Sequence, residues 1–281
     1  MITYKTPAKI NLFLDIISKR EDQYHDILSL MVKITLFDDL IVDIAENDKI
    51  VLEVNGNAPL GEENICFKAA EVMRKKYNIS SGISIKLNKF IPTEAGLGGG
   101  SSNAAYVIKG IDKIFDLGLS DEELIETGAS LGSDVPVFIT DAPWIIAQGR
   151  GEKVRGVYPD FKFSAIVIFP GFGIKTASIY QKWKPSLTHS ECWDKIKLCS
   201  NSEVNMNFLK KYSYNVFEKI VGDERLSSLK KNLMNFHAQV VGMSGTGSAL
   251  YAVFSAQDEA LQAKESLIPM GYQVFVVESL K

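Results

Sequence analysis

The segment with the clearest chemical signature is residues 92–103, PTEAGLGGGSSN, which combines four glycines with two serines and an asparagine. A strand-like run precedes it, and an amphipathic run with helical spacing follows from about Ser101. Glycines permit positive φ angles, and the N-terminus of a helix presents free N–H groups and a positive dipole end to an anion. A flexible linker would have polar segments on both sides. The pattern therefore favours a phosphate-binding loop.

The common phosphate-binding loops do not match this segment. A Walker A motif requires GxxxxGK[ST], and the chain contains no Gly-Lys pair. A dinucleotide-binding GxGxxG motif would need glycine at position 101, where Ser101 stands. The HRD and DFG signatures of protein kinases are also missing. Ser101 and Ser102 could bind a phosphate or its magnesium ion, or one of them could only cap the helix.

A lysine and an asparagine share one face of an apolar strand near the N-terminus. In PAKINLFL, residues 7–14, Lys9 and Asn11 are two positions apart, so both side chains project to the same side. A lysine inside a strand core requires an anionic partner. The alternative is a lysine on an edge strand, whose amine reaches the solvent.

Two further segments hold groups that could serve a ligand. Asp134 in LGSDVPVF, residues 131–138, could be a general base, or only the N-cap of the next helical turn. Gly242, Gly245 and Gly247 in GMSGTGSALYAVF, residues 242–254, alternate with hydroxyl residues before a strand. They indicate either an ordinary turn or a second backbone wall for a ligand.

Hydrophobic periodicity predicts the elements that must position these groups. Alternating apolar residues predict strands over 9–17, 32–44, 48–54, 82–92, 163–171 and 272–279, with Asp38 and Asp39 as interruptions. A strand–turn–strand unit is expected over 238–254, and a loop or short helix within 181–205. Helical spacing predicts helices over 64–78, from about 101 to 118, and over 120–132, 226–236 and 258–271. Asn64 is a candidate N-cap, and Ser120 with Glu123 forms a capping-box pattern.

Length and composition are those of an ordinary globular protein. The chain has 281 residues, 46% of them hydrophobic and 23% charged, with a formal net charge of −3. Such a charge gives no general attraction to nucleic acid or to anionic membranes. Three scattered cysteines form no zinc pattern and no segment is long enough for a membrane span, so a cytoplasmic protein is expected. The change of pattern after Gly151 predicts two α+β domains joined near residues 150–162.

Together, three of these motifs resemble those of a superfamily of small-molecule kinases. PAKINLFL, PTEAGLGGGSSNAA and GMSGTGSALYAVF are similar, in this order, to the motifs of galactokinase, homoserine kinase, mevalonate kinase and phosphomevalonate kinase. The resemblance implies ATP-dependent phosphorylation of an alcohol group by a two-domain α+β fold. It implies a ribosomal-protein-S5-like domain over 1–160 and a ferredoxin-like domain over 161–281, whose last strand could pack back on the first domain.

Other segments are similar to one branch of this superfamily. They are QYHDI at 23–27, LGSDVPVF, and GRGEKV at 149–154. The branch phosphorylates the 2-hydroxyl of a cytidine diphosphate-linked methylerythritol in the non-mevalonate route to isoprenoid precursors. Tyr24 and His25 distinguish it, because other members of the superfamily do not usually carry this pair. A kinase of the homoserine or mevalonate type and a catalytically silent nucleotide-binding relative remain alternatives.

The resemblance also implies roles for individual residues. Asp134 would accept or orient the proton of the substrate hydroxyl, and Lys9 would offset charge on the transferred phosphoryl group. ATP would be bound by Pro92, Gly96, Leu97, Gly98, Gly99, Gly100, Ser101, Ser102 and Asn103, with Asn64 and Lys89 near the adenosine. The substrate would contact Asn11, Tyr24, His25, Thr176 and Tyr180. Mg²⁺ would be held mainly by the phosphates, and a monomer or homodimer without nucleic-acid or membrane partners is expected.

Three residues depart from the usual pattern of the branch. Gln23 stands where glycine usually precedes the Tyr-His pair, and a non-glycine residue costs about 1 kcal/mol if that turn needs a positive φ. Tyr180 stands where phenylalanine is often found, which keeps an aromatic surface for stacking. Ser248 replaces the Pro, Ala or Cys of the third motif. The first departure bears on substrate geometry, and none changes the expected reaction class.

Overall fold

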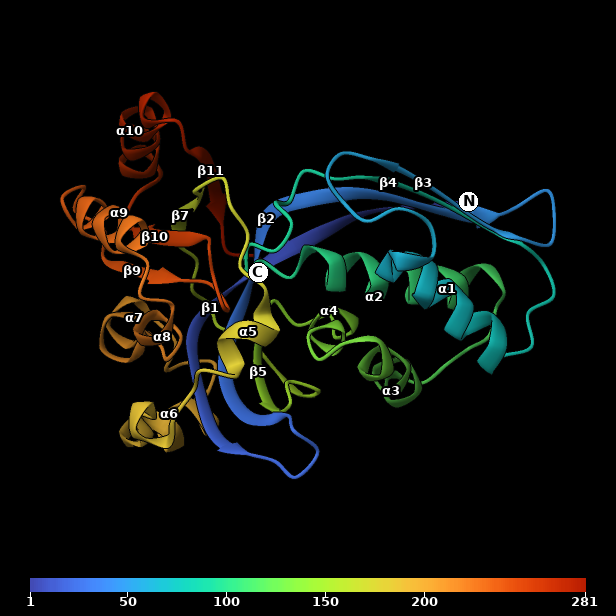
Figure 1. The fold of residues 1–281 in the computed structure, drawn as a ribbon, viewed down its shortest axis with the longest axis horizontal. Coiled ribbons are helices and arrows are strands. Elements are labelled where there is room, and N and C mark those ends of the chain that lie inside the picture. Colours follow the sequence, from blue (N-terminus) through green and yellow to red (C-terminus); the bar gives the residue numbers. More distant parts are fainter.

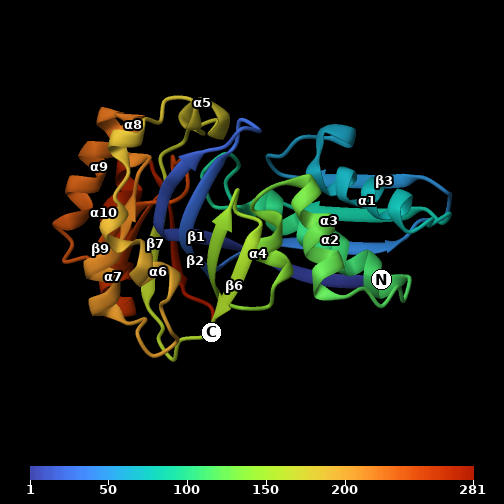
Figure 2. The same ribbon diagram turned by 90° about the horizontal axis from the view of Figure 1, so that it is seen from below.

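Two β-sheets with helices packed on their outer faces make up the protein (Figures 1 and 2). The computed structural model describes residues 1–281, apart from the side chain of Ala177. A seven-stranded sheet has the order β3-β4-β2-β1-β8, with β5 beside β2 and β6 beside β5. A four-stranded sheet has the order β11-β7-β10-β9. This arrangement confirms the predicted α+β class.

The seven-stranded sheet contains β1 (Ile2–Lys19), β2 (His25–Ile44), β3 (Ile50–Asn55), β4 (Ile83–Asn88), β5 (Trp144–Gly149), β6 (Lys153–Val157) and β8 (Tyr214–Asn215). The four-stranded sheet contains β7 (Ser164–Phe169), β9 (Val240–Met243), β10 (Leu250–Phe254) and β11 (Gln273–Glu278). The helices are α1 (Ile65–Lys76), α2 (Gly99–Ile114), α3 (Asp121–Leu131), α4 (Val135–Ile139), α5 (Thr176–Tyr180), α6 (Trp193–Lys197), α7 (Met206–Tyr212), α8 (Glu218–Val221), α9 (Glu224–Met234) and α10 (Gln257–Leu267).

A long antiparallel hairpin of β1 and β2 passes between the two halves of the molecule (Figure 1). The strands pair from Ile2–Val42 to Lys19–His25, with irregularities that bend the hairpin along its length. Residues 6–16 of β1 are buried throughout, because side chains on both faces of the strand are covered. Ala8 and Ile10 pack on the four-stranded sheet. The residues that alternate with them therefore face the opposite side.

Helices α1 to α4 cover one face of the seven-stranded sheet (Figure 1). Asn64 caps α1 by accepting the N–H of Cys66, and Ser120 and Glu123 form the capping box of α3, as predicted. The apolar faces of α1 and α2 pack on apolar side chains of β2 and β4 in one cluster. This packing fixes where α2 begins, and with it the glycine-rich loop.

Helices α9 and α10 cover the outer face of the four-stranded sheet (Figure 2). The C-terminal half also reaches the long hairpin, because Phe13 of β1 pairs with Tyr214 of β8. At the end of the chain, Ser279 forms a bridge with Ile34 of β2. The division into domains at residue 160 stays a prediction.

Several expected boundaries were wrong. β2 runs through Asp38 and Asp39 without interruption, because the N–H groups of Phe90 and Ile91 donate to the Asp38 carboxylate. The strand expected over 82–92 ends at Asn88. Helix α2 begins at Gly99, with Gly98 as N-cap, and ends at Ile114. Neither serine of the loop caps it, because both already lie within its first turn.

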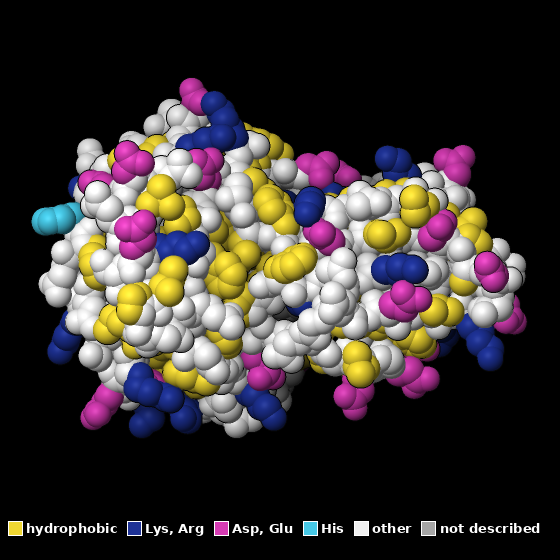
Figure 3. All heavy atoms as spheres, turned by 90° about the horizontal axis from the view of Figure 1, so that it is seen from above, with side chains coloured by type: hydrophobic (Ala, Val, Ile, Leu, Met, Phe, Trp, Pro, Cys, Tyr) yellow, Lys and Arg dark blue, Asp and Glu magenta, His cyan; other side chains and the backbone are white. Residues whose placement is uncertain are grey.

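The surface carries mixed charge. On the face drawn in Figure 3, acidic and basic side chains are interspersed, in keeping with a net charge of −3. No helix among the described residues is long and apolar enough to span a membrane.

The turn between β1 and β2 generates a stability prediction. Gln23 has a φ of 69°, which lies in the left-handed region that glycine adopts without strain. We expect Gln23→Gly to raise the free energy of unfolding by about 0.5–1 kcal/mol, measured by urea denaturation. Glu21→Gly is the control, since Glu21 is in the same turn but not in the left-handed region, and it should lower stability. Equal destabilisation by both changes would contradict the assignment of strain to Gln23.

Candidate active site

A cavity of about 1090 Å³ collects residues from segments that are far apart in the sequence. Its walls come from β1, the β1–β2 turn, the glycine-rich loop, the residues before α4, helix α5 and the turn between β9 and β10. The predicted site residues that line it are Lys9, Asn11, Tyr24, His25, Asn64, Lys89, Pro92, Gly96, Leu97, Gly98, Gly99, Gly100, Ser101, Asn103, Asp134, Thr176, Tyr180 and Gly245. Ser102, Gly242 and Gly247 are not part of the lining that the structure describes.

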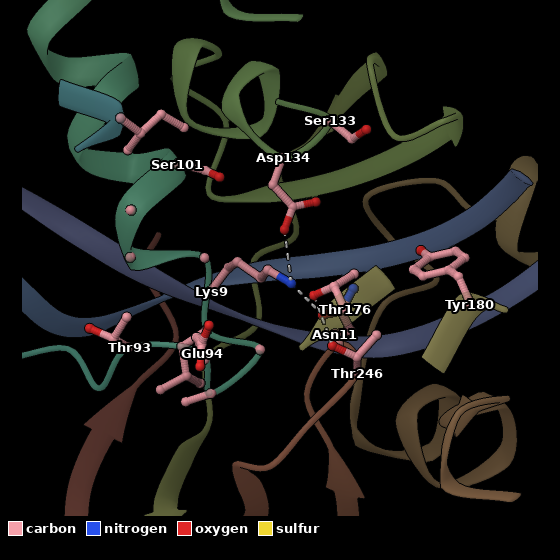
Figure 4. A pocket seen from close by; sticks show the side chains of 18 of the residues that line it. Lys9, Asn11, Thr93, Glu94, Ser101, Ser133, Asp134, Thr176, Tyr180 and Thr246 are labelled. Carbon is pink, nitrogen blue, oxygen red and sulfur yellow. Dashed lines mark hydrogen bonds and ion pairs between the residues drawn. The ribbon is translucent and has the colours of Figure 1, made fainter. Parts of the chain in front are cut away.

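Lys9 and Asp134 face each other in this cavity (Figure 4). The Lys9 Nζ lies 3.4 Å from Oδ2 of Asp134. It also donates to Oδ1 of Asn11 at 2.6 Å, and the Asn11 amide donates to Ser29 Oγ at 2.9 Å. Because Lys9 is only 2% exposed, the alternative of a lysine reaching the solvent from an edge strand is wrong. The amine is held between a carboxylate and an amide.

Asp134 occupies the N-cap position of α4 but does not cap the helix. Its side chain makes no capping hydrogen bond, and its carboxylate is 33% exposed. The alternative of a purely capping role is therefore wrong. A carboxylate that is partly exposed inside a cavity and held near an amine can accept a hydrogen bond from a ligand hydroxyl.

The glycine-rich loop presents backbone N–H groups to the cavity at the start of α2. Gly96 and Gly98 have φ angles of 78° and 70°, so the loop uses the left-handed conformation twice. A Cβ on Gly98 would lie 3.1 Å from the Lys9 side chain and 3.0 Å from Phe138. Glycine at this position thus allows the loop to approach Lys9. The first helical hydrogen bond joins the Ser102 N–H to Gly98, which leaves the preceding N–H groups free for an anion.

The carbonyl oxygens of the same loop accept hydrogen bonds from neighbouring segments. The donors are the glycine turn between β9 and β10, the segment before α5, and β1. The bonds are Lys9 N–H to Leu97 O (2.9 Å), Ser244 Oγ to Gly96 O (2.8 Å), Ala249 N–H to Ala95 O (3.1 Å) and Ile174 N–H to Glu94 O (3.0 Å). A Cβ on Gly96 would lie 2.0 Å from the Ser244 carbonyl oxygen, so only glycine permits this contact. The third motif therefore supports the phosphate loop as well as contributing Gly245 to the cavity.

The two serines and the remaining glycines of the motifs have different surroundings. Ser101 lines the cavity, whereas the Ser102 hydroxyl is buried and has no hydrogen-bond partner among the described residues. Of the two predicted phosphate ligands, only Ser101 is therefore accessible in this arrangement. Gly242 and Gly247 are packing positions, since a Cβ would meet Tyr251 at 2.5 Å and Met243 at 2.6 Å respectively.

Asn64 and Lys89 line the cavity but also have structural partners. The Asn64 side chain accepts from Cys66 N–H and donates to the carbonyl of Pro59. Lys89 forms an ion pair with Asp38 and donates to Asn103. Both members of the ion pair are nearly inaccessible, at 5% and 0% exposure. The predicted contacts of Asn64 and Lys89 with adenosine stay a prediction.

Aromatic rings form the end of the cavity that lies nearest the β1–β2 turn. Tyr180 lies 5.4 Å from His25 and 4.7 Å from Phe217 between ring centroids. Burial, with a smaller effect from Lys19, lowers the pKa of His25, which keeps the imidazole neutral at pH 7. Burial and the nearby charge of Asp134 raise the pKa of Tyr180, so its hydroxyl stays protonated. This end offers flat apolar faces and a neutral hydrogen-bonding ring.

Sequence reasoning assigned no site role to several residues in or beside the cavity, among them Thr246, Trp183, Arg150 and Asp38. Thr246 shares a 3.1 Å hydrogen bond with Thr176 and lines the cavity. Trp183 and Arg150 also line it, and Trp183 lies edge-on to His25 at 5.4 Å. Asp38 holds Lys89 from outside the cavity. A tryptophan three positions after Tyr180 in an otherwise polar segment was the one available signal for Trp183.

The buried ion pair beneath the loop generates a second stability prediction. Replacing Lys89 with methionine removes the cation from a fully buried Asp38 carboxylate, and we expect a loss of about 3–5 kcal/mol in the free energy of unfolding. Lys86→Met is the matched control, because Lys86 lies three positions earlier, in β4, in an exposed pair with Glu53 and should change stability by under about 1 kcal/mol. Denaturation of the ligand-free protein measures both. A similar small effect for both variants would show that the Asp38 pair contributes little.

Comparison with known proteins gives consistent matches along the chain. The model of the GHMP kinases N terminal domain matches residues 64–142. A 4-diphosphocytidyl-2-C-methyl-D-erythritol kinase of Clostridioides difficile (strain 630) is 35% identical over 292 aligned residues, which cover 99% of this chain and 95% of the relative. A kinase with the same name from Acetivibrio thermocellus is 33% identical, and the alignment covers 99% of this chain and 99% of the relative.

Solved structures match the fold over its whole length. The crystal structure of a 4-(cytidine 5'-diphospho)-2C-methyl-D-erythritol kinase has a TM-score of 0.81 at 26% identity and covers 100% of both chains. A mevalonate kinase has a TM-score of 0.72 at 16% identity over 99% of both chains, which shows a shared fold. The predicted α+β small-molecule kinase fold is confirmed by these similarities.

Proposed function

The chain belongs to the 4-diphosphocytidyl-2-C-methyl-D-erythritol kinase family of the GHMP kinases, and we propose that it phosphorylates the 2-hydroxyl of 4-diphosphocytidyl-2-C-methyl-D-erythritol. The phosphoryl donor is ATP, and the reaction is a step of the non-mevalonate route to isoprenoid precursors. One observation carries the proposal. The Lys9–Asp134 pair lies in one cavity with a loop of free N–H groups and with the Tyr24–His25 pair.

The loop and the start of α2 suit a triphosphate. The N–H groups of Gly99, Gly100 and Ser101 precede the first helical hydrogen bond, and the dipole of α2 adds a partial positive charge there. Lys9, whose side chain packs on Gly98, adds a full positive charge next to the loop. These groups would hold the transferred phosphate and stabilise the charge that develops on its oxygens.

Asp134 is placed to receive the proton. The substrate 2-hydroxyl oxygen forms a bond to the γ-phosphorus, the bond from that phosphorus to the bridging oxygen of ADP breaks, and the hydroxyl proton moves to the Asp134 carboxylate. Lys9, 3.4 Å from this carboxylate, places a positive charge beside the reacting groups. Asn11 holds the lysine amine in this position through its 2.6 Å hydrogen bond.

The aromatic end of the cavity suits the cytosine base. Tyr24 and Tyr180 offer flat faces for stacking, and the neutral imidazole of His25 can both donate and accept a hydrogen bond. Thr176 and Thr246 lie between this end and the Lys9–Asp134 pair, where they could bind the polyol or its phosphates (Figure 4).

The oxygen atoms at the phosphate end also fit a magnesium ion. Mg²⁺ binds through one or two carboxylates together with phosphate oxygens and water. The Ser101 hydroxyl is the protein group that would hold it in this cavity. The described residues form no cluster of three or more His, Cys, Asp or Glu side chains able to hold a metal, so the phosphates would supply most ligands. When bound, the ion would neutralise charge on the phosphate oxygens.

Asp134→Asn tests the assigned proton acceptor. We expect turnover to fall by about 10²–10⁴-fold, because an amide cannot accept the proton, while ATP affinity remains close to that of the unchanged protein. An ADP-release assay measures turnover, and calorimetry measures ATP binding. Asp141→Asn is the control, since Asp141 pairs with Lys109 and is not part of the described cavity lining. Near-normal turnover by Asp134→Asn would refute the role.

The same ADP-release assay separates the proposed substrate from its rivals. We expect rapid ADP release with 4-diphosphocytidyl-2-C-methyl-D-erythritol and none above background with homoserine or mevalonate. Release only with homoserine or mevalonate would favour another kinase of the superfamily. ATP binding without release on any of the three substrates over hours would favour a catalytically silent relative, against which the Lys9–Asp134 pair argues.

A further inference from the structure

Arg150 lies over the ring of Tyr24. The guanidinium carbon is 4.8 Å from the ring centroid, within the range of a cation–π contact. The two residues come from different turns, the β5–β6 turn and the β1–β2 turn. The turns are adjacent because Gly149 of β5 pairs with Ile27 of β2. Both side chains line the cavity.

The Tyr24 ring has fewer packing contacts than the other aromatic rings of the cavity, so the contact with Arg150 matters more for its position. It is 52% exposed, whereas Tyr180 is packed between His25 and Phe217. Its backbone follows the left-handed Gln23 at the tip of a hairpin. An exposed ring with few neighbours can populate several rotamers, and fixing one of them costs entropy on ligand binding. The guanidinium supplies a neighbour on one face of the ring.

The Arg150 guanidinium has no ion-pair partner, although its charge contributes weakly to lowering the pKa of the exposed Asp22 carboxyl, after the larger effect of Arg20. Four cations line the cavity, and Lys9 and Lys89 have carboxylate partners at 3.4 Å and 2.5 Å. Among the described residues, the Arg150 guanidinium and the Lys19 amine form no ion pair within 4 Å, and the Glu152 carboxylate accepts only from the backbone N–H of Arg150. Arg150 is therefore free to interact with the electron-rich face of the ring. Its planar guanidinium can also stack in parallel, which the amine of Lys19 cannot.

From this geometry we infer that Arg150 is a positioning residue of the base-binding end, which fixes the Tyr24 ring and leaves one face of it for a planar nucleobase. The inference rests on the proposed function, because it assigns the cytosine ring to that open face. It makes the β5–β6 turn part of the substrate site, together with the β1–β2 turn. Arg150 acts here through Tyr24 and not by contact with the phosphates.

A double-mutant cycle with two probes tests this inference. Calorimetry gives the dissociation constants of cytidine, which has no phosphate, and of CDP, for the unchanged protein, Arg150→Ala, Tyr24→Ala and the double variant. We expect Arg150→Ala to weaken cytidine and CDP by the same factor of about 3–10. In the Tyr24→Ala background the same change should have an effect of less than about 2-fold, because its target is gone. Arg150→Lys should restore only part of the affinity.

A nearby lysine provides the control for this binding experiment. Lys153→Ala removes a positive charge just after the same turn without being part of the described cavity lining, and it should leave both affinities unchanged. A loss for CDP but not for cytidine would show that Arg150 contacts phosphate and would overturn the inference. So would equal losses with and without Tyr24, or no loss at all. If the unchanged protein binds neither probe, the substrate assignment under the proposed function fails together with this inference.

Discussion

The carbonyl oxygens of Ala95, Gly96 and Leu97 are all hydrogen-bonded by groups outside the loop, namely Ala249, Ser244 and Lys9. A short loop of this kind can direct its N–H groups to a ligand only if its carbonyl groups are satisfied on the other side. Two of the three donors come from the turn between β9 and β10. The glycine-rich loop, which we propose to bind phosphate, therefore keeps its conformation only while the second sheet is docked against it.

The same docking also fixes the groups that we propose to handle the proton. The Asn11 N–H donates to Ser244 Oγ, and the Asn11 side chain holds the Lys9 amine. Lys9 in turn bonds the loop through its backbone and faces Asp134 through its side chain. One connected set of hydrogen bonds and an ion pair thus links the glycine-rich loop to Asp134, the proposed proton acceptor. A GHMP kinase of this family needs this relation, because phosphoryl transfer depends mainly on positioning.

Local sequence patterns predicted most elements and the α+β class, and the resemblance to a kinase superfamily implied most of the side chains that meet in the cavity. Glycine spacing, alternation around Lys9 and the capping signals are local, so a single sequence carries them. The errors came from long-range contacts. Asp38 appeared to interrupt a strand, but its carboxylate is satisfied by residues about 50 positions away. Arg150 and Tyr24 meet only through strand pairing, and the support of the loop by Ser244 depends on the docking of two sheets.

Nucleotide binding by Gly96→Ala tests the central claim most directly, because a Cβ there would lie 2.0 Å from the Ser244 carbonyl oxygen and would separate the loop from its support. Calorimetry should show ADP affinity reduced by more than about 10-fold while cytidine affinity persists. Gly118→Ala is the matched control, since Gly118 has a φ of 64° but nothing within 4 Å of an added Cβ, and it should leave ADP affinity unchanged. A folded Gly96→Ala protein with undiminished ADP affinity would contradict the account.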